Sequence, residues 1–315
     1  MRAILAEFRG GLFFGIYPVV GPSSLVIRSY NILSAALLDM TIPLFPPAVG
    51  GAENQASLLA RQLGHMGVEV TVLTRKLEDT QIEESIGPNS RVLRLPAVSS
   101  GQFLWRLMRY LGRRANGCDV LHFHTLDSPL LAALVPRLLH RRPVVAKVTR
   151  SGPCGPIDVL AGGRGLRRLR WLLLRRSVDR FVAVNEESRS ELESAGVDWS
   201  RIASIPNGVD VSATTSPSEN RVGLRRELRL PPDAFIGTCV GRLIPRKRFE
   251  WAVEAWKQLV SEDPRPRVLL ILGDGPERGR LESKAATLRD RGLVRFMGQV
   301  SRETVIKLLS GSDCF

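Results

Sequence analysis

Cysteine is scarce in this sequence: there are four in 315 residues, and no two of them form a CxxC pair. Such spacing argues against a zinc site and a disulfide framework, and it fits a reducing cellular compartment. Only three tyrosines are present, which leaves little aromatic surface for stacking nucleic-acid bases. No DxD-like cluster of carboxylates follows a predicted strand. We therefore expect neither a metal ion nor a cofactor.

Acidic residues are also under-represented, with 31 Asp and Glu against 45 Lys and Arg, and the formal net charge is +14. The excess is spread over both halves of the chain, so it is not a basic tail. It predicts an anionic partner, which by charge alone is a nucleic acid, an acidic membrane surface or a phosphorylated small molecule. The hydrophobic content of 44% is typical of a soluble globular protein, and the length predicts two domains.

Residues 10–27 carry no charge and approach the minimum length of a membrane span. Pro18, Gly21 and Pro22 interrupt this run, and no clear cleavage site follows it. A membrane or signal segment is one interpretation. The other, which we prefer, is that residues 1–39 form a poorly packed extension or a degraded first strand.

From residue 67 onward, short β-branched runs alternate with longer amphipathic stretches. Strands separated by helices of this length indicate βαβ units, and hence an α/β fold with a parallel sheet. We assign residues 40–205 to this first, Rossmann-like domain. The predicted strands are 68–75, 119–125, 143–149 and 180–185, and the predicted helices are 52–66, 101–115 and 128–142.

The alternation stops at a stretch rich in Pro, Asn, Ser and Thr, of which we assign residues 206–221 to a linker. It then restarts in a second Rossmann-like domain, residues 222–315. The chain ends with "SDCF", where a new apolar strand should begin. We therefore expect the second domain to be incomplete and this chain to be a fragment. The predicted strands are 234–243, 267–275 and 294–300, and the predicted helices are 249–263, 277–292 and 302–312.

Ligands of open parallel sheets bind at the carboxyl ends of the strands. The stretch "PPAVGGAENQ" places Gly50 and Gly51 before a predicted helix, where free N–H groups attract phosphate or carboxylate. An ordinary capping turn explains the same residues equally well. The stretch "LGDGPERGRLE", which contains Gly275, has a tight glycine turn, but its spacing does not match the dinucleotide fingerprint G-x-G-x-x-G.

The stretch "GRLIPRKRFE" (residues 241–250) comes directly after the apolar run "AFIGTCV" and raises the question of which anion balances its charge. Arg242 is suited to a bidentate phosphate contact, and Lys247 would add a point charge near the start of the helix at Phe249. Cations at a helix N-terminus are locally unfavourable, so an anionic ligand would relieve the conflict. A solvated basic loop is the alternative.

Two further features are ambiguous. His122 and His124 alternate at the end of one predicted strand, and we expect them to point to opposite faces, so that one faces the cleft. Hydrogen-bonded structural histidines are the alternative. Residues 163–180 place arginines around an apolar block, which suits either a helix lying on an anionic membrane or a core helix with solvated ends.

Taken in order, six stretches of the sequence resemble glycosyltransferase family 4, over about residues 43–315. The resemblance implies a GT-B fold of two Rossmann-like domains, a nucleotide-sugar donor linked to UDP or GDP, and sugar transfer with retention of configuration. The matching stretches are "PPAVGGAENQ", "DVLHFHT", "IPNGVD", "VGRLIPRKRFE", "LLILGDGPERGRLE" and "VRFMGQVSRETVIKLLSGSDCF".

The resemblance also implies roles for residues. Arg242 and Lys247 would contact the donor diphosphate, and Gly50 and Gly51 would approach the donor phosphates or the acceptor. The backbone at Phe296, Met297 and Gly298 would lie against the nucleotide base. Asn207 and Gly275 are further candidates for the cleft, together with His122 and His124.

Two departures from the family pattern stand out. Arg150 or a neighbour takes the place of a histidine that the family often carries near the reacting sugar, so no catalytic histidine is transferred. The family's pair of glutamates would lie beyond Phe315, and we expect this chain to have little transferase activity. We expect a cytoplasmic enzyme with a saccharide or lipid-linked acceptor, in peripheral contact with a membrane and without nucleic acid; a non-catalytic nucleic-acid-binding protein is the alternative.

Overall fold

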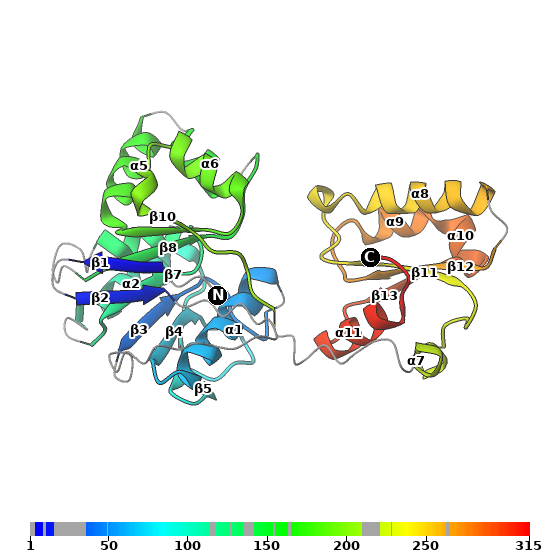
Figure 1. The fold of residues 1–315 in the computed structure, drawn as a ribbon, viewed down its shortest axis with the longest axis horizontal. Helices are drawn as coiled ribbons and strands as arrows, with labels where there is room; N and C mark the ends of the chain where they lie inside the picture. Colours follow the sequence, from blue (N-terminus) through cyan, green and yellow to red (C-terminus); the bar gives the residue numbers. More distant parts are fainter. Residues whose placement is uncertain are drawn as a thin grey trace. The chain divides into compact units, whose positions relative to one another are not determined.

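The computed structural model describes residues 4–8, 11–15, 36–48, 50–113, 117–126, 128–134, 142–153, 155–162, 165–209, 221–227, 229–262 and 265–315. The chain divides into two compact units, Met1–Asp210 and Val211–Phe315. Both units are α/β, as predicted (Figure 1). Most of the predicted linker lies outside the described residues.

At the N-terminus, β1 (Ile4–Phe8) pairs antiparallel with β2 (Gly11–Gly15). Residues 16–35 lie outside the described residues, so the nature of the uncharged segment stays a prediction. Over the described ranges, no helix has both the length and the apolar character needed to cross a membrane.

The first unit is built on an eight-stranded sheet, in which every neighbouring pair is parallel except β5 and β6. Parallel strands require crossover connections, which place helices on both faces of the sheet. In sheet order the strands are β10 (Ile202–Ser204), β9 (Arg180–Ala183), β8 (Val144–Val148), β7 (Val120–Phe123), β3 (Leu37–Thr41), β4 (Glu69–Arg75), β6 (Ser90–Leu95) and β5 (Glu83–Gly87).

One face of this sheet is covered by α1 (Gly51–His65), whose buried Ala56 and Leu59 pack with Met40 of β3 and Val72 of β4. Side chains of the opposite face form a second apolar cluster with α2 (Ser100–Arg113), the 3₁₀ helix η1 (Ser128–Ala133) and α5 (Leu166–Ser177). Other helices in the described part of this unit are α4 (Pro156–Ala161), α6 (Glu186–Ser194) and η2 (Trp199–Arg201).

The predicted helix 128–142 is only partly described. Its first six residues form the 3₁₀ helix η1, not an α-helix, and residues 135–141 lie outside the described residues. Tight 3₁₀ turns are frequent at helix ends and as connectors, which a pattern of apolar spacing cannot distinguish from an α-helix.

The second unit has three parallel strands, β11 (Phe235–Val240), β12 (Arg267–Leu272) and β13 (Val294–Gly298). One face packs against α8 (Phe249–Glu262), α9 (Arg278–Lys284) and α10 (Ala286–Asp290). The other packs against α11 (Arg302–Gly311), which contacts α7 (Arg221–Glu227). The single helix predicted at 277–292 is therefore wrong in detail, because the chain leaves helical geometry at Ala285 and forms α9 and α10.

After α11 the chain returns to the free side of β11, where Cys314 forms an isolated parallel bridge with Gly237. The Thr238 N–H donates to the Cys314 carbonyl at 2.9 Å. Strand pairing therefore begins in "SDCF", as the sequence predicted.

Candidate functional site

In the first unit, α1 begins at the carboxyl edge of the sheet. Its N-cap, Gly50, has extended backbone and makes no side-chain cap. A Cβ built on Gly50 would lie 2.0 Å from the Glu53 Oε2 atom, whereas a Cβ on Gly51 would meet nothing within 4 Å. The Glu53 carboxylate thus folds back over the positive end of the helix, where an anionic ligand would have to replace it.

The two histidines near the end of β7 lie together on one face of the sheet. The centroids of the His122 and His124 rings are 5.4 Å apart, and both side chains are buried. The expectation of opposite faces is therefore wrong, because residues two apart along a strand share a face. His122 pairs in register with Met40, which packs under α1, so both rings lie on the α1 side.

Lys147 of β8 joins the histidines on this face, and the sequence analysis missed it. His122 pairs with Val145, so Lys147, two residues further, lies level with His124. Burial lowers the pKa of Lys147 to about 8. The sequence does contain a signal that could have revealed Lys147: it is the single charged residue inside the apolar strand "PVVAKVT". A charged side chain in a buried strand needs a reason, and here it lies on the same face of the sheet as His122 on the neighbouring strand.

Burial, reinforced by the charge of Lys147, lowers the pKa of His122 to about 3. The pKa of His124 is held well below its ordinary value, first by burial and then by the charges of His122 and Lys147. Both imidazoles are therefore neutral near pH 7. Within the described part of the chain, His122 Nε2 and both ring nitrogens of His124 have no hydrogen-bond partner. Neutral rings in this state can donate to or accept from a hydroxyl group.

Asn207 is exposed, in the segment that follows β10. The next residue, Gly208, is tied to α1, because its carbonyl accepts a 2.8 Å hydrogen bond from the Gln55 side chain. Asn207 is thereby held beside α1.

In the second unit, three loops interlock at the carboxyl edge of the sheet through backbone hydrogen bonds. The Gly241 N–H donates to Leu272 O, Leu243 N–H donates to Asp274 O, and Gly273 N–H donates to Gly298 O. Glycine is required where these loops touch: a Cβ on Gly275 would lie 2.4 Å from the Leu243 carbonyl oxygen. Backbone contacts thus hold the loops together at the edge of the sheet where ligands of open parallel sheets bind.

Arg242 and Lys247 lie on this edge and are both exposed. Lys247 ends the 3₁₀ helix η4 (Pro245–Lys247), just before α8. Its Cε atom lies 3.9 Å from the position of a Cβ on Gly241, so the side chain folds back over the loop that carries Arg242. Neither side chain has a carboxylate within ion-pair distance in the described ranges.

The neighbouring strand β13 carries Met297, which is half-exposed, and Phe296, which packs against the α8 side of the core. Arg278, from α9, bridges Asp274 and Glu282 at 2.9 and 2.8 Å. The Asp274 carboxylate also accepts from Gly275 N–H, and these two hydrogen bonds lower its pKa. Arg278 is therefore already neutralised, unlike Arg242 and Lys247.

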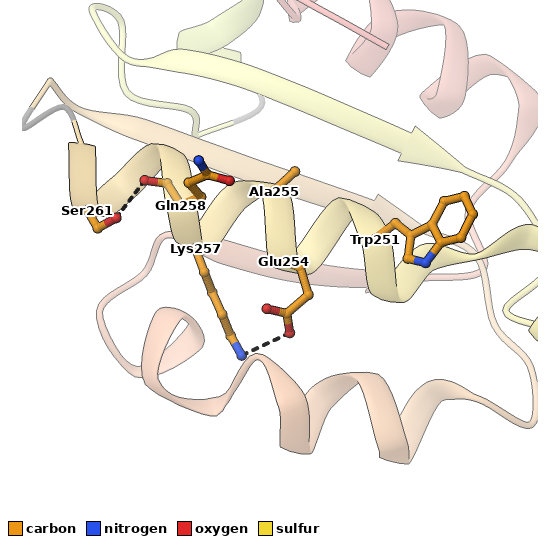
Figure 2. A pocket seen from close by; sticks show the side chains of 6 residues that line it. All are labelled: Trp251, Glu254, Ala255, Lys257, Gln258 and Ser261. Atoms are coloured by element: carbon orange, nitrogen blue, oxygen red, sulfur yellow. Dashed lines mark hydrogen bonds and ion pairs between the residues drawn. The ribbon is translucent and has the colours of Figure 1, made fainter.

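A hollow of 660 Å³ on the surface of α8 is a poorer candidate for a ligand site than the carboxyl edge of the sheet (Figure 2). The Lys257 Nζ and Glu254 carboxylate in it lie 3.3 Å apart, and Ser261 donates to the Gln258 carbonyl of the same helix at 2.7 Å. Its polar groups thus satisfy one another.

The structure therefore brings the predicted residues into two groups, one in each unit. Gly50, Gly51, His122 and His124 lie at the carboxyl edge of the first unit, and Arg242, Lys247, Gly275 and Gly298 at that of the second. In the described ranges, no three His, Cys, Asp or Glu side chains lie close enough to hold a metal ion.

Residues 49–213 match the family model described as Glycosyltransferase Family 4, and residues 221–315 match the model described as Glycosyl transferases group 1. A D-inositol 3-phosphate glycosyltransferase of Kineococcus radiotolerans is 28% identical over 89% of this chain and 68% of its own length. The corresponding protein of Streptomyces bingchenggensis is 26% identical over 83% of this chain and 64% of its own length. The chain thus spans about two thirds of these relatives.

Solved structures support the same fold. Anabaena HepE, determined in complex with UDP and glucose, has a TM-score of 0.66 at 20% identity, covering 88% of this chain and 72% of HepE. WaaG, a glycosyltransferase involved in lipopolysaccharide biosynthesis, has a TM-score of 0.64 at 14% identity, with 88% and 73% covered. A UDP-GlcNAc 2-epimerase of Methanocaldococcus jannaschii also matches, with a TM-score of 0.53 at 13% identity, covering 89% of this chain and 77% of the epimerase. The fold alone therefore does not define the reaction.

Proposed function

Since this chain belongs to glycosyltransferase family 4, we propose that it transfers a sugar from a UDP- or GDP-linked donor to an acceptor hydroxyl, with retention at the anomeric carbon. The observation that carries this proposal is the pair Arg242 and Lys247, two exposed cations beside interlocked glycine loops, for which the described residues supply no ion-pair partner. The ligands of HepE, UDP and glucose, have the matching chemistry.

In this proposal, the second unit binds the donor. Arg242 makes a bidentate contact with the diphosphate, and Lys247 adds a point charge. When the bond between the sugar and the diphosphate breaks, negative charge accumulates on the departing oxygen. Arg242 and Lys247 stabilise that charge, and being positioned beforehand they need no reorganisation at that moment. The exposed backbone at Met297 and Gly298 lies against the base.

In the first unit, the acceptor hydroxyl and the sugar approach the edge where α1 begins. His122 and His124 are neutral near pH 7 and hydrogen-bond sugar hydroxyls there. Burial keeps them neutral in the first place, and the charge of Lys147 adds to this because it disfavours a second cation nearby. Gly50 and Gly51 offer backbone N–H groups to a phosphate of the donor or the acceptor.

The acceptor is a saccharide or a lipid-linked saccharide. Support for the latter comes from α5, on which Leu169 and Leu173 are exposed among arginines while Trp171 and Leu174 are buried. Such a helix can contact an anionic membrane with one face and the core with the other. Free thiols at Cys118, Cys239 and Cys314 support a cytoplasmic location.

The test is calorimetric titration of the whole chain with UDP and with GDP. Arg242→Ala and Lys247→Ala should each weaken binding by about 10- to 100-fold, the range expected for a hydrogen bond to a charged group. Arg246→Ala is the matched control, because it removes the same charge from an exposed position in the same loop. Equal affinities in all four proteins would refute the assignment of the diphosphate site.

A further inference from the structure

The outward surface of α2 is divided lengthwise into an apolar half and a basic half. Phe103, Leu107 and Leu111 are buried against the sheet. On the solvent side, Trp105 and Met108 are 57% and 37% exposed, three residues apart and therefore on one stripe. A parallel stripe carries a second set of residues at helical spacing: Arg106, Arg109 and Arg113.

The three arginines line one hollow. It has a volume of 450 Å³, and its other lining residues are Leu95, Trp105 and Tyr110. The Arg109 guanidinium carbon lies 5.4 Å from the centroid of the Trp105 ring. This stacking is a cation–π contact, which leaves the guanidinium free to bind an anion through its N–H groups.

No carboxylate of the described residues neutralises this stripe. None of the three arginines forms an ion pair within the described part of the chain, and the Arg106 Nε atom is buried there without a hydrogen-bond partner. The sequence of α2, SGQFLWRLMRYLGR, has no acidic residue, and that of α5, LRRLRWLLLRRS, has none either. Uncompensated guanidinium groups that share a hollow repel one another, and a bound anion relieves that repulsion.

The two acid-free helices belong to the same side of the first unit. Phe103 and Leu107 of α2 and Trp171 and Leu174 of α5 pack in one apolar cluster, and both helices contact η1. Like α2, α5 exposes apolar side chains beside arginines, namely Leu169 and Leu173.

We propose that α2 docks the first unit on an anionic lipid bilayer, with Arg106, Arg109 and Arg113 binding the phosphate of lipid head groups and Trp105 and Met108 entering the interface. This inference does not depend on the proposed function. A bilayer fits better than a free phosphate, because phosphate binding has no use for an exposed indole and thioether beside the arginines. It also fits better than a nucleic acid, because a base could stack on the indole of Trp105 but would make no use of the thioether of Met108.

The experiment is sedimentation of the whole chain with vesicles of phosphatidylcholine containing phosphatidylglycerol, compared with pure phosphatidylcholine. The triple variant Arg106→Gln/Arg109→Gln/Arg113→Gln should bind anionic vesicles about 100-fold more weakly, since each basic side chain near such a surface contributes roughly fivefold. The matched control, Arg61→Gln/Arg291→Gln/Arg302→Gln, removes the same charge from exposed positions elsewhere. It should lose much less binding.

Tryptophan fluorescence tests insertion separately. Anionic vesicles should shift the emission to shorter wavelength, and Trp105→Phe should lose most of that shift while its circular dichroism stays unchanged. Equal binding by the two triple variants would overturn the proposal, because it would reduce the effect to net charge. If glycerol 3-phosphate prevents sedimentation with vesicles and the vesicles cause no fluorescence shift, the ligand is a free phosphate. If the triple variant Arg106→Gln/Arg109→Gln/Arg113→Gln loses binding to duplex DNA but keeps binding to vesicles, the ligand is a nucleic acid. Each outcome contradicts bilayer docking.

Discussion

The carbonyl oxygen of Gly241 occupies the space that a side chain on Gly273 would need. A Cβ on Gly273 would lie 1.9 Å from that oxygen, and the φ of Gly273 is +130°. The loops that follow β11 and β12 are therefore in direct backbone contact. Because Arg242 is the next residue after Gly241, this contact fixes the place of a proposed ligand of the donor diphosphate.

We expect Gly273→Ala to lower both the stability of the second unit and its affinity for a nucleoside diphosphate. The added methyl group must push the two loops apart and adopt an unfavourable φ, at a cost of about 2–4 kcal/mol. Thermal unfolding and calorimetric titration measure the two effects. Gly279→Ala is the control: this position lies in α9 and an added Cβ meets nothing within 4 Å, so the variant should be as stable as the parent or about 0.5–1 kcal/mol more stable. Normal UDP or GDP binding by Gly273→Ala would show that the proposed site does not need the interlocked loops.

Arg225 should be the most sensitive charged residue of the second unit. It is buried, and its guanidinium group lies 2.6 Å from the Asp313 carboxylate and donates to the carbonyls of Gly311, Pro232 and Ala234. Arg225→Met should destabilise the unit by about 3–5 kcal/mol, because one partner of a buried pair is removed and the carbonyls lose their donors.

The control for Arg225 is the exposed pair between Lys307 and Glu227, at 3.3 Å. Lys307→Met should cost less than about 1 kcal/mol, since water screens a surface pair. Denaturant titrations of the two variants measure the difference. Similar losses in both would mean that burial does not strengthen the Arg225 contacts.

The histidine pair should make the first unit sensitive to acid. The folded-state pKa values of His122 and His124 lie below that of an unfolded histidine, so the unfolded state binds more protons below about pH 6.5; for His122 this window extends down to about pH 3. The contribution of these histidines to the free energy of unfolding is therefore complete above pH 6.5. Below pH 6.5 the free energy of unfolding decreases as the pH is lowered, by up to about 1.4 kcal/mol per pH unit for each histidine. The double variant His122→Gln/His124→Gln should flatten this dependence. The check is the free energy of unfolding from denaturant titrations at pH 7, 6 and 5, and an unchanged slope in the variant would contradict buried neutral histidines.

Much of the α/β pattern was predictable, because apolar periodicity is a local property of the chain. The runs at 68–75 and 143–149 were predicted as strands and are found at Glu69–Arg75 and Val144–Val148. The pattern at 249–263 is found as α8. Where local patterns are ambiguous, the predictions were wrong: η1 is a 3₁₀ helix, and one predicted helix is broken at Ala285.

The sequence by itself determined the order of strands and helices, the two-part organisation, and the presence of cations and glycines after particular strands. Only the tertiary structure decided that His122, His124 and Lys147 share one buried face, that Glu53 covers the start of α1, and which arginines have a carboxylate partner. The physical reason is that strand and helix periods are set by neighbours a few residues apart. Burial, ion pairing and pKa depend instead on groups that are distant in the chain and meet only when the sheet forms its register.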